Sequence, residues 1–391
     1  MNIAFFCIPA HGHTNPTLAV VRELTARGHT VRYYTTEAFR AKVEAAGAVF
    51  VPFDAEAARP GMTAADGARL GSDLAFSTKL IVDLTLAADD WLNRELTAHR
   101  PDVIVGDSMA FWAKLAAKKH GIPFVSSTTT FAFNRFSAKV IGQNGAGFLQ
   151  FLLAQPRINR QLKRLRAAGY AVKSVFDIIA NDNETETVVY TSPDFQPCAD
   201  TFSGKYHFVG PLLRPAQSSF EKLPGRSLIY ISLGTVNNDA LPFYRACLAA
   251  FGGDPRFQLV LSAGTQTDLA ALGPIPESCT VRASVDQMAV LDCADVFLTH
   301  CGMNSASEGL WHGLPLVLYP QTPEQHGVAN RVAALGAGVP LTDPSADGIR
   351  RAVETALTDP SYRENAQRLA GSFRRCGGAA EAADAIEHAA N

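Results

Sequence analysis

The amino-acid sequence predicts an α/β fold with two doubly wound domains, and three observations lead to this prediction. At 391 residues the chain is longer than one hydrophobic core ordinarily supports. Short apolar runs alternate with helical patterns from the amino terminus onward, which is typical of parallel sheets covered by helices on both faces. The alternation stops at residues 209–215, which contain a glycine and two prolines, and then starts again.

The individual elements are expected from hydrophobic periodicity and from helix start and stop signals. In the first half, strands are expected over 3–8, 30–35, 103–106 and 124–127, and helices over 16–27 and 37–46. In the second half, strands are expected over 228–232, 258–262, 296–299 and 315–319. The predicted organisation is an amino-terminal domain over 1–208, a linker over 209–217, a second domain over 218–360 and a helical tail over 361–391.

Composition limits the class of partner. The formal net charge is −2, so no broad basic surface for nucleic acid is expected. The chain lacks a run of about eighteen apolar residues, so no membrane span is predicted. The first apolar run has no basic region before it, which favours a buried strand over a signal peptide. Seven scattered cysteines without metal-ligand spacing favour reduced thiols and a cytoplasmic location.

The segment from His300 to Glu308 has the features of an anion-binding turn. An apolar run over 294–299 precedes it, and a short helical pattern follows. Gly302 lets the backbone approach a ligand, and the start of the helix offers N–H groups and a positive dipole end. Asn304 and Ser305 add polar side chains, and Glu308 lies one helical turn beyond Ser305, where its carboxylate can accept hydrogen bonds from ribose hydroxyls.

Four motifs in order resemble those of one enzyme family. The first is PAHGHTNP at 9–16, the second is PDVIVGD at 101–107, and the third is ISLGT at 231–235. The fourth is HCGMNSASE at 300–308, with Gln287 before it and Glu324-Gln325 after it. The set resembles the UDP-dependent family-one glycosyltransferases, and its opening is similar to that of the bacterial macrolide glycosyltransferases.

The resemblance covers nearly the whole chain and implies both fold and activity. The family fold, GT-B, consists of two Rossmann-like domains that face each other across a cleft, with a carboxy-terminal helix that crosses back to the first domain. The implied activity is inverting transfer of a hexose, glucose from UDP-glucose, to a hydroxyl of a flavonoid, phenol or macrolide. The expected partners are thus a nucleotide sugar and a hydrophobic small molecule, and the nucleotide sugar is a co-substrate rather than a cofactor.

An inverting transfer needs a base, and His13 is the candidate. It follows the first strand, where the crevice of a doubly wound sheet opens, and an ordinary imidazole titrates near neutrality. Asp107 ends another strand of the same sheet and can orient the imidazole. His11 is the rival base, but the family spacing of histidine to Pro16 fits His13. The alternative structural interpretation is that His13 caps the helix that begins near Asn15 or Pro16.

The donor is expected to bind without a metal, because helix-end amides and polar side chains can compensate the diphosphate charge. The glutamate and glutamine after the fourth motif are expected to bind sugar hydroxyls; helix capping is the alternative, more plausible for Glu324 than for Gln325. Cys301 is expected to be structural. The predicted donor-binding residues are Ser232, Gly234, Thr235, Val285, Gln287, His300, Gly302, Asn304, Ser305, Glu308, Glu324 and Gln325.

The acceptor pocket is expected from two regions that fit the strand and helix alternation poorly, 60–91 and 131–168. Both are rich in apolar and aromatic residues, and loops at the carboxyl ends of strands form the ligand crevice in such folds. For any one aromatic residue, simple core packing is the alternative. The candidates for acceptor binding are Phe76, Met109, Trp112, Phe131, Phe133 and Phe136.

One departure from the family leaves the nucleotide base open. Where relatives carry an aromatic residue this chain has Ser284, and where they carry proline it has Asp286. A TDP-sugar-using antibiotic glycosyltransferase is therefore an alternative. A catalytically inactive sugar-nucleotide-binding regulator is another, although such a protein would be expected to lose the base or phosphate residues. A nicotinamide enzyme is disfavoured because no complete Gly-x-Gly-x-x-Gly follows a strand.

Overall fold

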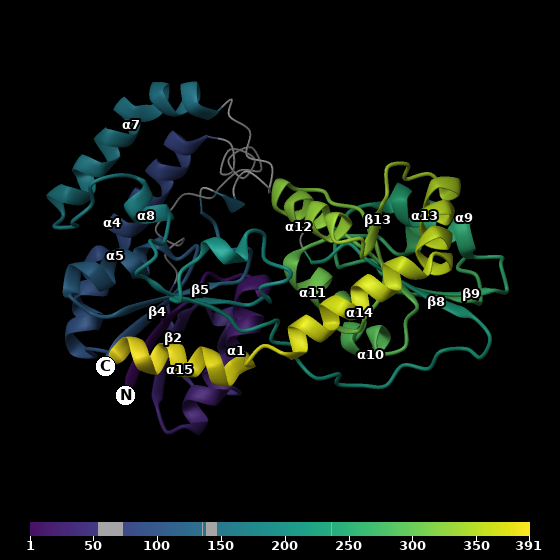
Figure 1. Cartoon of the computed structure of the whole chain (residues 1–391), viewed down its shortest axis with the longest axis horizontal. Helices are drawn as coiled ribbons and strands as arrows, with labels where there is room; N and C mark the ends of the chain where they lie inside the picture. The colour runs from purple at the N-terminus through teal and green to yellow at the C-terminus, as the bar shows by residue number, and fades with distance from the viewer. Residues whose placement is uncertain (54–72, 135, 138–146, 236) are drawn as a thin grey trace. The chain divides into compact units, whose positions relative to one another are not determined.

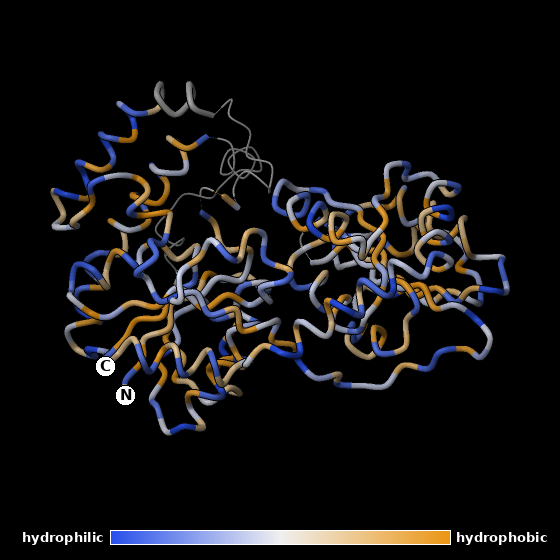
Figure 2. Tube along the Cα trace, in the orientation of Figure 1, coloured by the Kyte–Doolittle hydropathy of each residue, from blue (hydrophilic) through white to orange (hydrophobic). Residues whose placement is uncertain are grey.

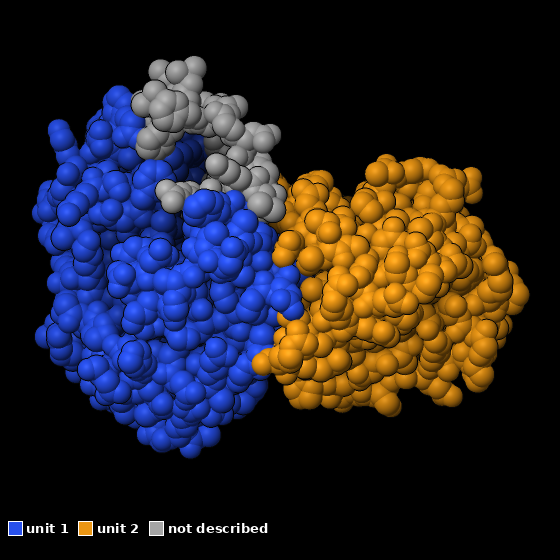
Figure 3. Space-filling model, viewed as in Figure 1, with its two compact units in different colours: residues 1–212, 376–391 blue, residues 213–375 orange. Residues whose placement is uncertain are grey.

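The computed structural model describes residues 1–53, 73–134, 136–137, 147–235 and 237–391. The chain divides into two compact units (Figure 3). Unit 1 contains Met1–Leu212 together with Cys376–Asn391, and unit 2 contains Leu213–Arg375. The division between Leu212 and Leu213 falls inside the segment predicted as a linker.

Unit 1 is built on a parallel sheet, part of which is labelled in Figure 1. In the described part of the chain this sheet has seven strands in the order β3-β2-β1-β4-β5-β6-β7. Its strands are β1 (Asn2–Phe6), β2 (Thr30–Thr35), β3 (Val49–Pro52), β4 (Val103–Asp107), β5 (Phe124–Thr128), β6 (Glu186–Val189) and β7 (Tyr206–Phe208). Its helices include α1 (His11–Ala26), α2 (Arg40–Glu44), α4 (Leu74–Ala98), α5 (Phe111–His120), α7 (Gly147–Ala167), α8 (Phe176–Ile179) and α15 (Gly378–Ala390).

Unit 2 repeats this plan with a parallel sheet, of six strands among the residues described, in the order β10-β9-β8-β11-β12-β13. Its strands are β8 (Ser227–Ser232), β9 (Phe257–Ser262), β10 (Cys279–Arg282), β11 (Val296–Thr299), β12 (Leu316–Leu318) and β13 (Gly338–Pro340). Its helices are α9 (Leu241–Phe251), α10 (Gln287–Leu291), α11 (Met303–Trp311), α12 (Pro323–Ala334), α13 (Ala346–Thr358) and α14 (Pro360–Arg374). The predicted architecture of two doubly wound domains is confirmed.

The central strands are apolar on both faces because helices cover both sides of each sheet. Figure 2 shows hydrophobic residues along these strands in both units. In unit 1 the Phe5 ring stacks on Tyr33 of the neighbouring strand, with centroids 4.9 Å apart. In unit 2 Tyr230 stacks on Phe297 in the same way at 4.8 Å. These cross-strand pairs hold the first strand of each unit against its neighbour.

The carboxy-terminal tail does not return to unit 1 as one piece, so that part of the domain prediction is wrong. Helix α14 belongs to unit 2, where Leu369 and Phe373 are buried, and only the segment from Cys376 onward joins unit 1. The helix breaks at Gly377-Gly378, and Gly378 has φ +65°, a left-handed conformation that glycine adopts without strain. After the break, Arg27 of α1 donates to Asp384 at 2.6 Å and to Glu387 at 3.0 Å, which fixes α15.

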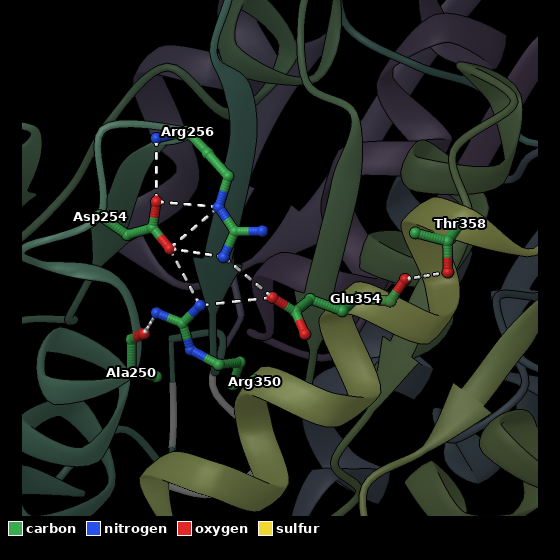
Figure 4. A network of polar contacts seen from close by, with 6 residues as sticks. All are labelled: Ala250, Asp254, Arg256, Arg350, Glu354 and Thr358. Atoms are coloured by element: carbon green, nitrogen blue, oxygen red, sulfur yellow. Dashed lines mark hydrogen bonds and ion pairs between the residues drawn. The ribbon is translucent and has the colours of Figure 1, made fainter.

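A polar network joins α13 to the loop before β9 in unit 2 (Figure 4). Asp254 accepts from the Arg256 guanidinium at 2.7 Å and from Arg350 at 3.0 Å, and Glu354 lies 3.3 Å from both guanidinium groups. The arginines hold the pKa of the Asp254 carboxyl far below its usual range. The groups lie near the surface, so we assign the network an orienting role rather than a large share of stability.

The two regions expected to form the acceptor pocket contain long helices. Helix α4 begins after Asp73, whose carboxylate accepts from the Phe76 N–H at 3.0 Å, and it packs against α7 through buried residues such as Ile81, Ile158 and Leu162. Within these regions, residues 60–72, 135 and 138–146 lie outside the described residues, as do the side chains of 147–153.

Candidate active site

Each sheet has a topological switch point, where the strand order reverses, and several of the predicted site residues lie at these two points. In unit 1 the reversal is between β1 and β4, and His13 follows β1 while Asp107 ends β4. In unit 2 the reversal is between β8 and β11, and the segments after them carry Gly234 and His300. Because ligands of open parallel sheets bind outside the carboxyl ends of strands at such points, each unit has one expected binding edge.

The His13 imidazole and the Asp107 carboxylate form a hydrogen-bonded pair. His13 Nδ1 lies 2.7 Å from Asp107 Oδ2, and the aspartate side chain is fully buried while that of His13 is 18% exposed. The second carboxylate oxygen accepts from the Met109 N–H at 2.9 Å. An ionised carboxylate only accepts, so Nδ1 carries the hydrogen and the lone pair of the neutral ring is on Nε2. This is the tautomer that a general base requires.

The alternative that His13 caps a helix is wrong. Helix α1 begins at His11 with Ala10 as the N-cap, no side chain in the described residues caps it, and Pro16 lies inside the helix. His13 is thus in the first turn, where the start of the helix fixes its backbone. The rival base, His11, is 3.3 Å from the Lys42 ammonium and packs against Phe39. Partial burial of the imidazole lowers the pKa of His11, and the positive charge of Lys42 lowers it further.

In unit 2, the His300 ring is held between two glycines. A β-carbon added at either Gly234 or Gly302 would lie 2.6 Å from His300 Nε2, closer than real β-carbons approach another atom. Gly234 has φ +81° and its N–H donates to Ser232 Oγ at 3.3 Å. The third and fourth motifs are therefore packed onto each other through this imidazole, and any larger residue at either glycine would displace it.

His300 is a neutral imidazole at neutral pH. Burial lowers its pKa from 6.5 to about 4, and its Nδ1 is buried with no hydrogen-bond partner among the described residues. A neutral ring still offers one N–H to a phosphate oxygen. The sequence indicated this residue as a phosphate ligand, but it did not indicate that the ring would lack charge.

The turn after β11 leads directly into helix α11, which begins at Met303 with Gly302 as its N-cap. The first N–H groups of a helix have no partner within the helix, and they are the groups that bind anions. Cys301 precedes them in a left-handed conformation with φ +64°, and it is buried beneath the turn. Burial raises the pKa of its thiol to about 12, so a structural role fits Cys301.

The predicted ribose ligand, Glu308, lies at the end of a buried hydrogen-bond chain. Tyr230 OH donates to Gln287 Oε1 at 3.0 Å, and Gln287 Nε2 donates to Glu308 Oε2. Burial raises the pKa of the Glu308 carboxyl. The chain leaves the other carboxylate oxygen of Glu308 able to accept from a hydroxyl, and it fixes Gln287 at the start of α10.

The aspartate that replaces proline in the family pattern has a structural function. Asp286 accepts hydrogen bonds from Arg214 at 3.0 Å, from the Gln217 N–H at 2.6 Å and from the Ser218 N–H at 2.9 Å. These partners lie in the segment before β8, next to the start of unit 2. A proline at this position could accept none of these bonds, so the substitution anchors that segment beside the predicted nucleotide site.

Comparisons with known proteins identify the family of this chain. A family model described as UDP-glucoronosyl and UDP-glucosyl transferase matches residues 271–374, and NDP-glycosyltransferase YjiC of Bacillus licheniformis is 33% identical over 99% of this chain and 97% of that protein. The chain belongs to this glycosyltransferase family. Demethyllactenocin mycarosyltransferase of Streptomyces fradiae is 34% identical over 99% of this chain and 86% of that protein.

Solved structures with a similar fold are also glycosyltransferases. The calicheamicin glycosyltransferase CalG4 is 30% identical over 99% of this chain and 97% of that chain, with a TM-score of 0.82. The glycosyltransferase of kitacinnamycin is also 30% identical, over 99% of this chain and 98% of that chain, with a TM-score of 0.86. The chain is therefore a GT-B glycosyltransferase.

Of the two residues expected to bind sugar hydroxyls, Glu324 and Gln325, the structure gives a capping role to Gln325. Gln325 completes a capping box at the start of α12, because its N–H donates to Thr322 Oγ1 at 3.4 Å and its Oε1 accepts from the N–H groups of Gln321 and Thr322. Glu324 is exposed in the first turn. Helix capping thus falls to the glutamine and not to the glutamate, the reverse of the sequence-based expectation. The side-chain NH₂ of Gln325 is the group left to bind a sugar.

The acceptor candidates of this glycosyltransferase divide into two groups. Met109, Phe133 and Phe136 are 50%, 48% and 42% exposed, which is unusual for large apolar side chains. Trp112 and Phe131 are instead buried, and Phe131 packs against Phe195 with centroids 5.3 Å apart, so both have packing roles. Phe76 is half-buried at the start of α4.

The loop that carries two of the exposed phenylalanines is fixed by side chains that the sequence did not indicate. Buried Gln196 accepts from the Ala132 N–H and donates to the Ala132 carbonyl, both at 2.9 Å. Asn134 accepts from the N–H groups of Phe136 and Ser137 at 2.8 and 2.9 Å. The rings are therefore presented by an ordered backbone.

A comparable residue supports the turn after β8 in unit 2. Asn238 is fully buried and donates to the Gly234 carbonyl at 3.0 Å, while its own side-chain oxygen accepts from the Gln266 N–H at 3.2 Å. No sequence motif contains it. Of the predicted residues nearby, Ser232 is buried and Thr235 is exposed.

The described residues also bear on two further kinds of partner, metal ions and membranes. Within the described residues, no three His, Cys, Asp or Glu side chains gather as metal ligands would. The predicted independence from metal stays a prediction. No helix in the described part of the glycosyltransferase is long and apolar enough to cross a membrane.

Proposed function

We propose that this enzyme transfers glucose from UDP-glucose to a hydroxyl of a hydrophobic small molecule, with inversion, to give a β-glycoside. The observation that carries the proposal is the 2.7 Å contact between His13 and Asp107, which keeps the basic lone pair on Nε2. His13 takes the proton of the acceptor hydroxyl as its oxygen attacks the anomeric carbon. The bond from that carbon to the diphosphate breaks on the opposite face, and UDP leaves with the electron pair.

Departure of UDP places charge on its diphosphate, and three kinds of donor near the start of α11 would stabilise that charge. They are the first N–H groups of the helix, the side chains of Asn304 and Ser305, and the N–H of neutral His300. Fixed dipoles of this kind do the work that a divalent cation does elsewhere, so the proposed reaction needs no metal or cofactor.

The nucleoside would lie between α10 and α11. Glu308 would accept from the ribose hydroxyls, and backbone groups of Val285 and Gln287 would bind the imide edge of the base. Ser284 is exposed and offers no ring for stacking, and uracil and thymine share that edge. This favours one second candidate, transfer from a TDP-sugar. The sugar itself would contact Glu324 and the NH₂ of Gln325.

The acceptor would be a flat apolar phenol or flavonoid, or a macrolide, since Met109, Phe133 and Phe136 expose apolar surface in the unit that holds the base. Several curated relatives act on such compounds, for example the oleandomycin glycosyltransferase of Streptomyces antibioticus, 31% identical over 99% of this chain. The proposal includes a cytoplasmic location, because scattered cysteines without metal-ligand spacing favour reduced thiols.

A donor and acceptor panel followed by mass spectrometry tests the proposal. UDP-glucose, UDP-galactose, TDP-glucose and a TDP-deoxysugar are each offered with a flavonol, a simple phenol and a macrolide. We expect gain of one hexose mass with release of an equal amount of UDP, and proton coupling at the anomeric position that identifies the β-linkage. Transfer from TDP-sugars alone would support the second candidate, and hydrolysis or epimerisation without transfer would refute both.

A further inference from the structure

The nitrogen that faces Asp107 has a second polar neighbour. Thr129 Oγ1 lies 3.0 Å from His13 Nδ1, and the threonine is 4% exposed. Thr129 directly follows β5, which lies next to β4 in the sheet. A residue from a third strand end therefore contacts the pair of His13 and Asp107. None of the four sequence motifs contains Thr129.

The single hydrogen on His13 Nδ1 decides how Asp107 and Thr129 bind to the ring. In the neutral base Nδ1 carries one hydrogen, and Asp107 is its main acceptor because a carboxylate is the stronger acceptor. The Thr129 oxygen then accepts the same hydrogen in a three-centre bond. When His13 takes a proton, Nδ1–H becomes a stronger donor and both contacts gain strength.

We propose that Thr129 is a positioning residue for the catalytic base: its hydroxyl shares the Nδ1–H of His13 with Asp107 and so fixes the rotation of the ring that aims Nε2 at the acceptor hydroxyl. One carboxylate oxygen alone allows the ring to pivot about the Nδ1 contact. A second acceptor on a different strand removes that freedom. The inference rests on the proposed function, in which His13 is the base.

The backbone around Thr129 is fixed on both sides, as a positioning role requires. Before it, the Thr128 carbonyl accepts from the Tyr190 N–H at 3.2 Å. After it, Gln196 holds both backbone groups of Ala132. The hydroxyl therefore has a position set by the sheet, and His13 must conform to it.

The titratable groups Cys7, His11 and Lys42 lie near the His13 ring but have other partners. Cys7, after β1, has its thiol 3.7 Å from Thr14 Oγ1, and burial keeps its pKa well above the usual range, so it carries no charge. His11 and Lys42, on α1 and α2, contact each other. Of these groups, Asp107 is the one with a hydrogen bond to the His13 ring in the described structure.

The test removes the hydroxyl while keeping the shape. Thr129→Val should lower kcat about three- to tenfold, the usual effect of one hydrogen bond, with the KM for the nucleotide sugar unchanged. The midpoint of the acid limb of the kcat–pH profile should move down by about half a pH unit, because the protonated ring loses a partner. Thr129→Ser, which restores the hydroxyl, should recover most of both effects. The matched control is Thr130→Val, since the hydroxyl of Thr130 contacts only the Phe131 carbonyl among the described residues.

A second readout does not depend on turnover. In protein labelled with ¹⁵N-histidine, the His13 ring nitrogens report the tautomer, and Thr129→Val should broaden or shift them while Thr130→Val does not. Wild-type kcat and wild-type ring signals in Thr129→Val would overturn the inference. So would an equal loss in Thr129→Ser, because that result would assign the effect to packing. Thr129→Ala removes the same hydroxyl if the valine variant does not fold.

The two readouts also separate this inference from the proposed function. If the wild-type protein transfers no sugar from any nucleotide donor, the proposed function fails, yet the ¹⁵N signals still report whether Thr129 holds the ring. If transfer is normal and the signals do not respond, the positioning role alone fails.

Discussion

Lowering the pH from 7 to 5 should destabilise unit 2 through His300. Burial lowers the pKa of this imidazole from 6.5 to about 4. Between these values the unfolded chain binds more protons than the folded one, so stability rises with pH. The contribution of His300 is fully present above about pH 6.5 and is lost as the pH falls toward 4. From pH 7 to 5 the difference amounts to about 2 kcal/mol.

The measurement is a double difference. Urea unfolding at pH 7 and pH 5 is followed by pulsed hydrogen exchange of peptides from residues 213–375, for the wild type and for His300→Gln. Glutamine is polar but does not titrate, so the pH dependence of all other groups cancels when the two proteins are subtracted. We expect the wild type to lose about 2 kcal/mol more than the variant.

Equal pH dependence in the two proteins would refute this reasoning, because it would mean that the ring is charged or solvated in the folded state. A complementary measurement uses UDP. The diphosphate should favour the protonated ring, so calorimetry at pH 5 in buffers of different ionisation enthalpy should show proton uptake on binding in the wild type and less uptake in His300→Gln.

Four other predictions follow. His13→Ala should lower transfer to an aliphatic alcohol by about 10² to 10⁴ while calorimetry shows unchanged UDP affinity; wild-type turnover would contradict the base assignment. Gln325→Glu keeps a capping oxygen and should alter the ratio of kcat/KM between UDP-hexoses with little change in Tm, whereas Gln325→Ala should also cost about 1 kcal/mol of stability; equal Tm values would argue against the cap. EDTA should leave the rate within about twofold, and a larger loss would indicate a catalytic metal. Ser284→Trp should tighten UDP binding by about 0.5 to 1.5 kcal/mol, and no gain would place the base elsewhere.

The sequence was informative where backbone chemistry decides the structure. The buried parallel strands are continuous apolar runs, and the turns after β8 and β11 need Gly234 and Gly302 because the His300 ring fills the space that β-carbons would occupy. The pairing of His13 with Asp107 was predictable because His13 follows β1, Asp107 ends β4, and the carboxyl ends of these strands meet at the same edge.

The remaining features depend on contacts between distant segments. Thr129, Gln196 and Asn238 belong to no local pattern, and their roles exist only because the sheets bring them to His13, Ala132 and Gly234. Helix boundaries were also missed. Pro16 suggested the start of α1, but the helix begins at His11.

Cys301 gives the turn after β11, the predicted phosphate site, a property that none of its polar groups supplies. A residue with a β-carbon at φ +64° stores strain of about 1 to 2 kcal/mol, and the surrounding structure has to hold it there. It is held by its own N–H, which donates to Thr299 Oγ1 at 3.2 Å, and by its thiol, which donates to the Thr299 carbonyl at 3.4 Å. The bend is thus imposed by contacts with the last residue of the strand before it. A turn that its own contacts hold in place loses little ordering entropy when a diphosphate binds, so this preorganisation would add to donor affinity.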